Sequence, residues 1–314
     1  MNKAFKLLIG YDGSDSSNNA LRDLKRAGLP RKVKAVVLTI ADVILPSTFL
    51  MTKRERAQKP LGLAFKNAHT HGAREVREAY ACSVRGSRKL KAIFPSWKVS
   101  PEVTADSPFW GLVKKAYDWR PDLVVVGARG LSASKRLFLG SVSQKVLTET
   151  RCAVRISRSE ANGFSPVRLV IAVDGSPEAA AAVQTVSLRS WPKGTAARLV
   201  TVADARIATA FVAPSSSVRV WTKKDDRDPQ AWVHRMLDGF KKKLSDSGLI
   251  VSSVVKEGDP KQALLQEAER WGADTLFLGS RGLGLTERLF LGSVSSAIAA
   301  RAHCSVEIVH LKRV

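Results

Sequence analysis

A glycine motif occurs twice in this chain, once in each half. Residues 127–141 read Gly-Ala-Arg-Gly, nine further residues and Gly-Ser, and residues 279–293 read Gly-Ser-Arg-Gly, nine residues and Gly-Ser. Each copy follows an apolar run, so its first glycine is expected where a buried strand ends and the backbone turns tightly. The Gly-Ser pair is expected to open a helix. A strand end and a helix N-terminus would then direct backbone N–H groups into one space, which favours phosphate binding.

The repeat extends well beyond the glycines. Four pairs of segments match at offsets of 162 or 152 residues, namely 9–14 with 171–176, 37–42 with 199–204, 119–122 with 271–274, and 152–156 with 304–308. A period near 150 residues is long enough for a complete domain. We therefore predict two duplicated domains, residues 1–160 and residues 161–314.

Apolar segments alternate with predicted helices in both halves. Continuous Val, Ile and Leu runs of this kind indicate a parallel sheet that is covered on both faces. Ligands of such sheets collect beyond the carboxyl ends of the strands, and Asp12, Ile40 and Gly127 are expected at such ends. The predicted strands lie near 5–11, 33–41, 97–103, 122–127, 152–157, 167–173, 197–203, 249–256, 274–279 and 304–310.

The Asp after the first strand and the glycine motif together resemble the signature of the universal stress protein family, in its tandem-domain, nucleotide-binding branch. Both halves carry both parts. The resemblance implies an α/β fold of two tandem doubly wound domains that pack as a pseudo-two-fold pair. Each domain would be a five-stranded parallel sheet in the order 3-2-1-4-5, flanked by helices. It also implies that the chain binds ATP, or AMP or ADP, with Mg²⁺ held by the phosphates.

The resemblance further assigns nucleotide contacts by position. Asp12 and Asp174 would receive adenine, and Ile40 and Val202 would flank its ring. The glycine loops would cover ribose and phosphate, and the helix starts would hold the β- and γ-phosphates, because a helix start favours negative charge and serine hydroxyls donate hydrogen bonds. The loop residues are Gly127, Arg129, Gly130, Gly279, Arg281 and Gly282, and the helix-start residues are Gly140, Ser141, Val142, Ser143, Gly292, Ser293, Val294 and Ser295.

Simpler interpretations exist for each element alone. An Asp-Gly-Ser after a strand is often only a turn with a helix cap, and a lone Gly-x-x-Gly is weak support for any ligand. The duplicated nine-residue spacing and the Arg shared by both loops favour nucleotide binding. The two sites are not identical, because Glu257–Pro260 replaces Ala105–Pro108 and Glu287 replaces Lys135.

Positive charge is concentrated in the first half. The formal net charge is +23, of which residues 1–160 carry +17 and residues 161–314 carry +6. Much of it lies within Lys53–Lys98, around a predicted amphipathic helix. A solvated helix face is the favoured interpretation, and a surface that binds polyanions such as nucleic acid is the alternative.

Composition and known motifs narrow the remaining classes. No apolar run approaches the length of a membrane span, the first strand starts within a few residues, and three cysteines fit reduced thiols, so we expect a cytoplasmic protein without membrane insertion. His69 and His71 have no partners at zinc-site spacing, and the Asp225–Asp228 cluster lacks calcium-loop spacing, so we predict no metal bound by side chains. No hydrolase or P-loop motif is present, and we predict no catalytic residues.

These observations favour a nucleotide-dependent regulatory or stress-response protein with little or no hydrolysis. The alternatives are a slow ATPase or adenylylating enzyme of the same fold, and a basic protein associated with nucleic acid. By the resemblance, the two halves should pair through their fifth strands, with Val154–Ile156 antiparallel to Val306–Ile308 and Arg155 close to Glu307. A further homodimer stays open.

Overall fold

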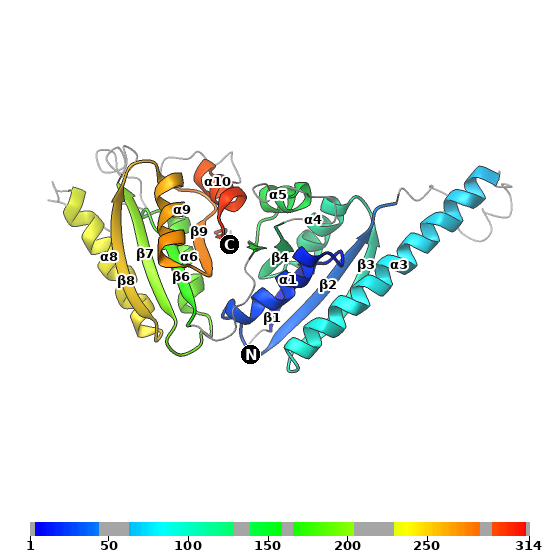
Figure 1. Cartoon of the computed structure of the whole chain (residues 1–314), viewed down its shortest axis with the longest axis horizontal. Helices are drawn as coiled ribbons and strands as arrows, with labels where there is room; N and C mark the ends of the chain where they lie inside the picture. Colours follow the sequence, from blue (N-terminus) through cyan, green and yellow to red (C-terminus); the bar gives the residue numbers. More distant parts are fainter. Residues whose placement is uncertain are drawn as a thin grey trace.

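The molecule consists of two α/β halves whose strands form one continuous sheet (Figure 1). In Figure 1 the first half lies on the right and the second on the left. The computed structural model describes residues 4–43, 63–128, 139–158, 166–203, 229–282 and 291–311, and it describes side chains for all of these except 63–71 and 229–230.

The first half is a parallel sheet in the order β3-β2-β1-β4-β5. Its elements are β1 (Phe5–Gly10), α1 (Asp15–Asp23), a short 3-10 helix (Leu24–Arg26), β2 (Val33–Ala41), α3 (Leu63–Ile93), β3 (Lys98–Ala105), α4 (Pro108–Trp119), β4 (Leu123–Gly127), α5 (Ser141–Glu149) and β5 (Ala153–Ser157).

The second half repeats this arrangement as β8-β7-β6-β9-β10, again with parallel neighbours. Its elements are β6 (Arg168–Ala172), α6 (Pro177–Ser187), β7 (Ala196–Ala203), α8 (Pro229–Asp246), β8 (Ile250–Glu257), α9 (Pro260–Trp271), β9 (Thr275–Gly279), α10 (Ser293–Arg301) and β10 (Ser305–Val309).

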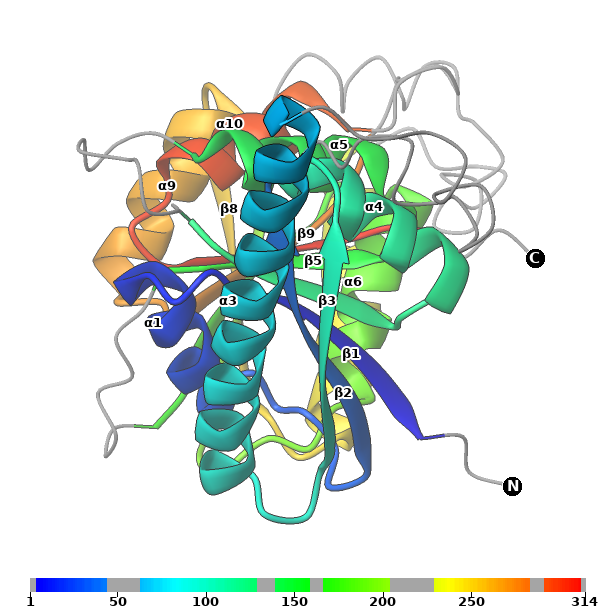
Figure 2. The same ribbon diagram turned by 90° about the vertical axis from the view of Figure 1, so that its right-hand side faces the viewer.

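The helices cover both faces of the sheet. Buried residues of α1 and α3 pack on one face of the first half, and those of α6 and α8 pack on the matching face of the second. Residues of α4, α5, α9 and α10 share a single core on the other face, and this core runs through both halves. Figure 2 shows α3 lying alongside β3 at the end of the molecule that belongs to the first half. The predicted doubly wound fold and its strand order are confirmed.

The two halves join through their fifth strands. β5 and β10 pair antiparallel, with Val154 opposite Ile308, Arg155 opposite Glu307, and Ile156 opposite Val306. The expected pairing of these segments is therefore confirmed, and two edges that would otherwise expose unpaired backbone groups cover each other. The pairing is symmetric about residues 155 and 307, which gives the two halves their pseudo-two-fold relationship.

Candidate functional site

The predicted adenine-binding carboxylate of the first half organises a tight turn after β1. Oδ1 of Asp12 accepts hydrogen bonds from the backbone N–H of Ser14 at 3.0 Å and from its hydroxyl at 2.6 Å. Gly13 has φ of +81°, a conformation that favours glycine. Ser14 in turn caps α1 by accepting from the N–H of Ser17 at 3.1 Å. Asp12 itself is exposed at the carboxyl end of the sheet.

The second half builds the same turn from the equivalent residues. Oδ1 of Asp174 accepts from the N–H of Ser176 at 3.0 Å, and Ser176 caps α6 by accepting from the N–H of Ala179 at 3.2 Å. Gly175 has φ of +85°. The turn-and-cap interpretation of Asp-Gly-Ser therefore holds in both halves. It leaves each carboxylate beside the end of its strand.

The first glycine of each motif lies against the first turn of a helix. A Cβ on Gly127 would lie 2.5 Å from Oγ of Ser16 in α1, and a Cβ on Gly279 would lie 2.5 Å from Cβ of Glu178 in α6. Both separations are too short for any side chain at the glycine. The close approach of strand and helix therefore explains why these two positions need glycine.

The Gly-Ser pairs open helices, as the sequence predicts. Gly140 and Gly292 precede α5 and α10, and their N–H groups donate to the carbonyls of Ala128 at 2.9 Å and Ser280 at 2.7 Å. These bonds fix each helix start beside the end of its strand, where the predicted phosphate contacts would lie.

Two serines follow each of these glycines, and they occupy different environments. The buried Ser143 and Ser295 donate their hydroxyls to the carbonyls of Gly127 at 2.7 Å and Gly279 at 2.8 Å. Ser141 and Ser293 are exposed. The structure thus places the first serine at the surface of the site, and it uses the hydroxyl of the second to hold helix against strand.

Among the described residues, the N-termini of α5 and α10, like that of α4, receive no side-chain cap bond, in contrast to those of three other helices. α1, α6 and α9 begin at Ser14, Ser176 and Asp259, whose side chains each accept a first-turn N–H. α5 and α10 begin at glycine, and no side-chain cap bond is present within the part of the chain that the structure describes. First-turn N–H groups without a side-chain acceptor provide the donors that an anion needs.

The glycine loop of the second half contacts the strand-end carboxylate. A Cβ on Gly282 would lie 2.5 Å from Oδ2 of Asp174. The next residue back, Arg281, donates from Nε to Oε1 of Glu178 at 3.0 Å and pairs with the same oxygen through Nη2 at 2.7 Å. The structure therefore brings the predicted loop and carboxylate of this half together, and it adds Glu178.

His310 lies just after β10, near Arg281. Burial, and then the positive charge of Arg281, lower the pKa of His310 from 6.5 to about 4. Its Nε2 is buried and finds no hydrogen-bond partner among the described residues. Sequence reasoning missed both Glu178 and His310. Alignment of the repeat places Ser16 opposite Glu178 and Arg158 opposite His310, and these unlike pairs are a signal in the sequence that could have pointed to both residues.

The equivalent loop of the first half, with Arg129, Gly130 and Lys135, lies outside the described residues, as do Glu287 and Asp225–Asp228. The predicted ring-flanking residues are described. Ile40, the penultimate residue of β2, is half-buried against α4, where a Cβ on Gly111 would lie 3.0 Å from its Cγ1. Val202 is buried near the end of β7. Both lie at strand ends, as predicted, and both belong to the core shared by the two halves.

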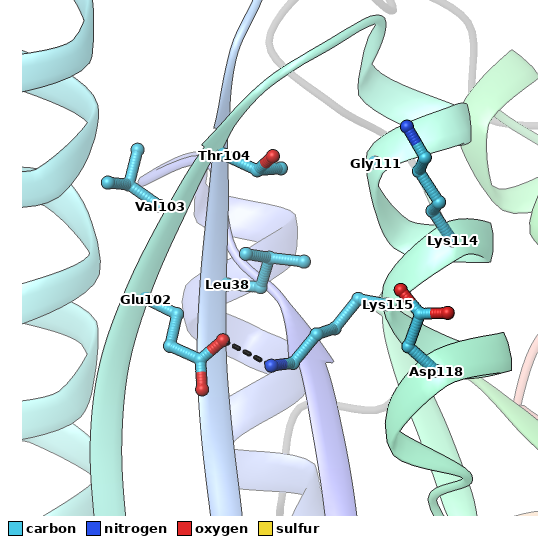
Figure 3. Close-up of a pocket in the computed structure, with 8 residues that line it drawn as sticks. All are labelled: Leu38, Glu102, Val103, Thr104, Gly111, Lys114, Lys115 and Asp118. Carbon is cyan, nitrogen blue, oxygen red and sulfur yellow. Dashed lines mark ion pairs between the residues drawn. The ribbon is translucent and has the colours of Figure 1, made fainter.

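A small hollow lies apart from these residues, between the edge strand β3 and α4 (Figure 3). Its volume is about 240 Å³. In Figure 3 the Lys115 side chain points toward Glu102, with which it forms an ion pair at 2.5 Å. None of the predicted nucleotide contacts lines it. The lining residues are Leu38, Glu102, Val103, Thr104, Gly111, Lys114, Lys115 and Asp118.

The cysteines and histidines form no recognisable metal site in the described ranges, where no group of three or more His, Cys, Asp or Glu side chains is placed to hold an ion. Cys82, Cys152 and Cys304 are not joined in disulfide bonds. Burial raises the pKa of Cys304 to about 12, so this thiol stays protonated. Within the same ranges, no helix combines the length and apolar character needed to cross a bilayer.

Comparison with known proteins identifies relatives of both halves. A sequence model of the Universal stress protein family matches residues 4–158 and 167–310. A universal stress protein A-like protein of Arabidopsis thaliana is 38% identical over 71 residues, which span 23% of this chain and 41% of that protein. A putative universal stress protein of Staphylococcus epidermidis is 30% identical over 146 residues, which span 45% of this chain and 82% of that protein.

Solved structures extend the likeness to the whole chain at the level of the fold. The crystal structure of a universal stress protein from Archaeoglobus fulgidus superimposes with a TM-score of 0.63 at 21% identity, covering 97% of this chain and 98% of that one. A protein of unknown function from Pseudomonas aeruginosa gives a TM-score of 0.58 at 13% identity, covering 98% and 92% of the two chains. The tandem arrangement of the two halves therefore occurs in other proteins.

Proposed function

This chain belongs to the universal stress protein family, and on that premise we propose that it is an ATP-binding regulatory protein whose nucleotide occupancy changes its shape or its choice of partner. Each half would contribute one site, at the carboxyl ends of β1 and β4 or of β6 and β9. AMP or ADP are the alternative ligands, and Mg²⁺ would be held by the phosphates. We also propose domain limits at residues 1–160 and 161–314 and a cytoplasmic location.

The contact between Gly282 and Asp174 is the observation that carries this proposal. It joins the glycine loop to the strand-end carboxylate, 108 residues earlier in the chain. The α10 N-terminus, which lacks a side-chain cap, starts beside the end of β9 through the bond from Gly292 to Ser280. An adenine nucleotide needs a carboxylate that meets its adenine ring, backbone N–H groups close to its phosphates, and a helix N-terminus that favours their negative charge.

Little or no hydrolysis is part of the proposal. Asp12 and Asp174 accept the hydrogen bonds of their turns, and Glu178 is paired with Arg281. A general base must be within reach of an attacking water and must be able to accept its proton. Among the described residues of the two sites, these three carboxylates are already engaged in turns or an ion pair, which supports binding rather than hydrolysis.

Calorimetry on the purified chain tests the function directly. Any co-purifying nucleotide is first released and identified, and the protein is then titrated with ATP, ADP and AMP. We expect saturable binding of adenine nucleotide with a stoichiometry of up to two, and turnover slower than release of the ligand. Absence of binding by all three nucleotides would refute the proposal, and rapid multiple turnover of ATP would favour the enzyme instead.

Binding of polyanions is a second candidate, and the exposure of basic side chains along α3 favours it. Six of them are exposed, namely Arg74, Arg77, Arg85, Arg88, Lys89 and Lys91. Some are engaged locally, as in the ion pair of Arg74 with Glu78 at 2.8 Å and the bond from Lys89 to Asn18 at 2.7 Å. A solvated helix face therefore stays the favoured interpretation of this surface.

A further inference from the structure

The two candidate sites differ at one position of the helix that touches the glycine motif. Ser16 in α1 and Glu178 in α6 are equivalent in sequence, at the offset of 162 residues. They are also equivalent in space, because each lies 2.5 Å from the Cβ that Gly127 or Gly279 lacks. The first half thus has a neutral hydroxyl where the second has a carboxylate.

The Glu178 carboxylate is committed to the arginine of its own glycine loop. Its side chain is only 7% exposed, and Oε1 receives both Nε and Nη2 of Arg281. Arg281 is the residue that would otherwise meet phosphate. Because the pair carries no net charge, the positive charge of Arg281 is largely cancelled where phosphate would lie.

No carboxylate occupies this position in the first half. Asp15 precedes Ser16, but it is exposed, and it lies about 100° further around the helix, where water and salt screen its charge. Ser16 adds no charge beside Gly127. At this position the first half is therefore less negative than the second by one charge.

We propose that Glu178 makes the second site a poorer binder of triphosphate than the first, so that the two halves prefer adenine nucleotides with different numbers of phosphates. The inference rests on the proposed function. Each added phosphate brings further negative charge toward Glu178, so the penalty grows from AMP to ATP. The first site would favour ATP. At the second site, the affinity for AMP would be reduced less than the affinity for ATP, or not at all.

Calorimetry with one site silenced at a time tests this. Gly292→Val would isolate the first site and Gly140→Val the second, and the affinities of ATP and AMP are measured for each at one fixed salt concentration. We expect the ratio of ATP to AMP affinity to be about tenfold lower at the second site. Glu178→Ser should raise that ratio about tenfold, and Ser16→Glu should lower the ratio of the first site by a similar factor.

Two isosteric variants separate charge from structure. Glu178→Gln removes the charge and keeps the shape, and it should raise the second-site ratio as Glu178→Ser does. Glu267→Gln is the matched control, because Glu267 is also a buried, ion-paired carboxylate of the second half, with Arg198 at 2.7 Å and Lys256 at 2.8 Å. It should leave the ratio unchanged.

The outcomes distinguish this inference from the proposed function. Binding at both sites with equal ratios, or a Glu178→Gln variant in which ATP and AMP affinities change equally, would overturn the role of Glu178 and leave nucleotide binding intact. Absence of any adenine nucleotide from both sites of the unmodified chain would overturn both proposals.

Discussion

Arg155 and Glu307 face each other across the joint between the two halves, with Nη1 of the arginine 3.4 Å from Oε2 of the glutamate and both side chains fully buried. Each also has a second partner. Arg155 donates to both oxygens of Asp23, at 2.7 and 3.0 Å, and to the hydroxyl of Thr275 at 2.9 Å. Glu307 pairs with Arg189. Burial lowers the pKa of Arg155, but Asp23 and then Glu307 outweigh it, and the pKa is raised overall.

Removing Arg155 should therefore destabilise the molecule strongly. Arg155→Met leaves the buried carboxylates of Asp23 and Glu307 without their shared partner, and the expected loss is about 3–5 kcal/mol of unfolding free energy. Urea unfolding at pH 7 measures it. Glu307→Gln should cost less, because Arg155 keeps Asp23. A smaller loss of unfolding free energy for Arg155→Met than for Glu307→Gln would contradict this ranking.

The same network changes what a charge swap should do. Facing opposite charges suggest that reversal at both positions would restore the contact. In the structure, Glu at 155 would face Asp23, and Arg at 307 would face Arg189. We expect the double variant Arg155→Glu with Glu307→Arg to lose at least as much unfolding free energy as the two single variants lose together. A double variant close to wild-type stability would contradict this.

The helix starts of α5 and α10 should be required for phosphate binding. Gly140 and Gly292 have φ of −62° and −75° with extended ψ, which any residue adopts, so valine adds no backbone strain, and circular dichroism checks that the fold survives at the buried Gly292. The valine side chain would occupy space beside the first-turn N–H groups. We expect each of Gly140→Val and Gly292→Val to weaken ATP binding in its own half by about 100-fold. Unchanged affinity in the double variant would show that these helix starts hold no phosphate.

Alanine at Gly279 should destabilise the second half. Its Cβ would lie 2.5 Å from Cβ and 2.7 Å from the carbonyl carbon of Glu178, and a backbone atom cannot move aside as a flexible side chain does. We expect a loss of about 1–3 kcal/mol. At Gly127 the nearest atom is the hydroxyl of Ser16, which can rotate, although the backbone carbon follows at 2.9 Å. Gly127→Ala should therefore cost less, and an equal or larger cost in denaturant unfolding would contradict the comparison.

The exposed basic face of α3 should bind polyanions only weakly. Arg85 and Arg88 are exposed one turn apart, and contacts of such side chains with phosphate are sequence-independent and weaken steeply with salt. We expect a random single-stranded oligonucleotide to bind at low salt and to lose at least about tenfold in affinity by about 0.2 M salt. The double variant Arg85→Glu with Arg88→Glu should bind it more weakly. Sequence-selective binding that survives high salt would promote nucleic-acid association to the main function.

Local pattern was enough to predict the strands and the helix starts. The apolar runs at Leu123–Gly127 and Thr275–Gly279 end in glycine, and a Gly-Ser pair follows each of them at the next helix start, so each boundary carries its own signal. Contacts between side chains that are distant in the sequence carry no such local signal. Arg281 meets Glu178 across 103 residues, and Arg155 meets Asp23 across 132. The facing pair Arg155 and Glu307 was predictable because the family resemblance supplied the strand pairing, and the antiparallel register then followed from the repeat.

His310 should make the stability of the molecule depend on pH below neutrality. Its pKa is about 4 in the folded chain against 6.5 in the reference state, so between these values the unfolded chain binds a proton that the folded chain does not. Stability is therefore fully present above about pH 6.5 and is lost as the pH falls toward 4, by up to about 3 kcal/mol.

Urea unfolding at pH 7, 5.5 and 4.5 measures this dependence. The compared proteins have the same carboxylates, so the effect of carboxylate titration on stability cancels in the comparison. His310→Leu should flatten the difference between pH 7 and pH 4.5, because no proton is then taken up at that position on unfolding. The exposed His303 is the matched control, and His303→Gln should behave as the wild type. Arg281→Gln should raise the pKa of His310 in the folded chain, because the positive charge that adds to the effect of burial is gone. The pH range over which stability is lost should then be narrower at its lower end. A wild-type pH profile in the His310→Leu variant would show that His310 titrates alike in the folded and unfolded chain, and that its burial beside Arg281 has no energetic consequence.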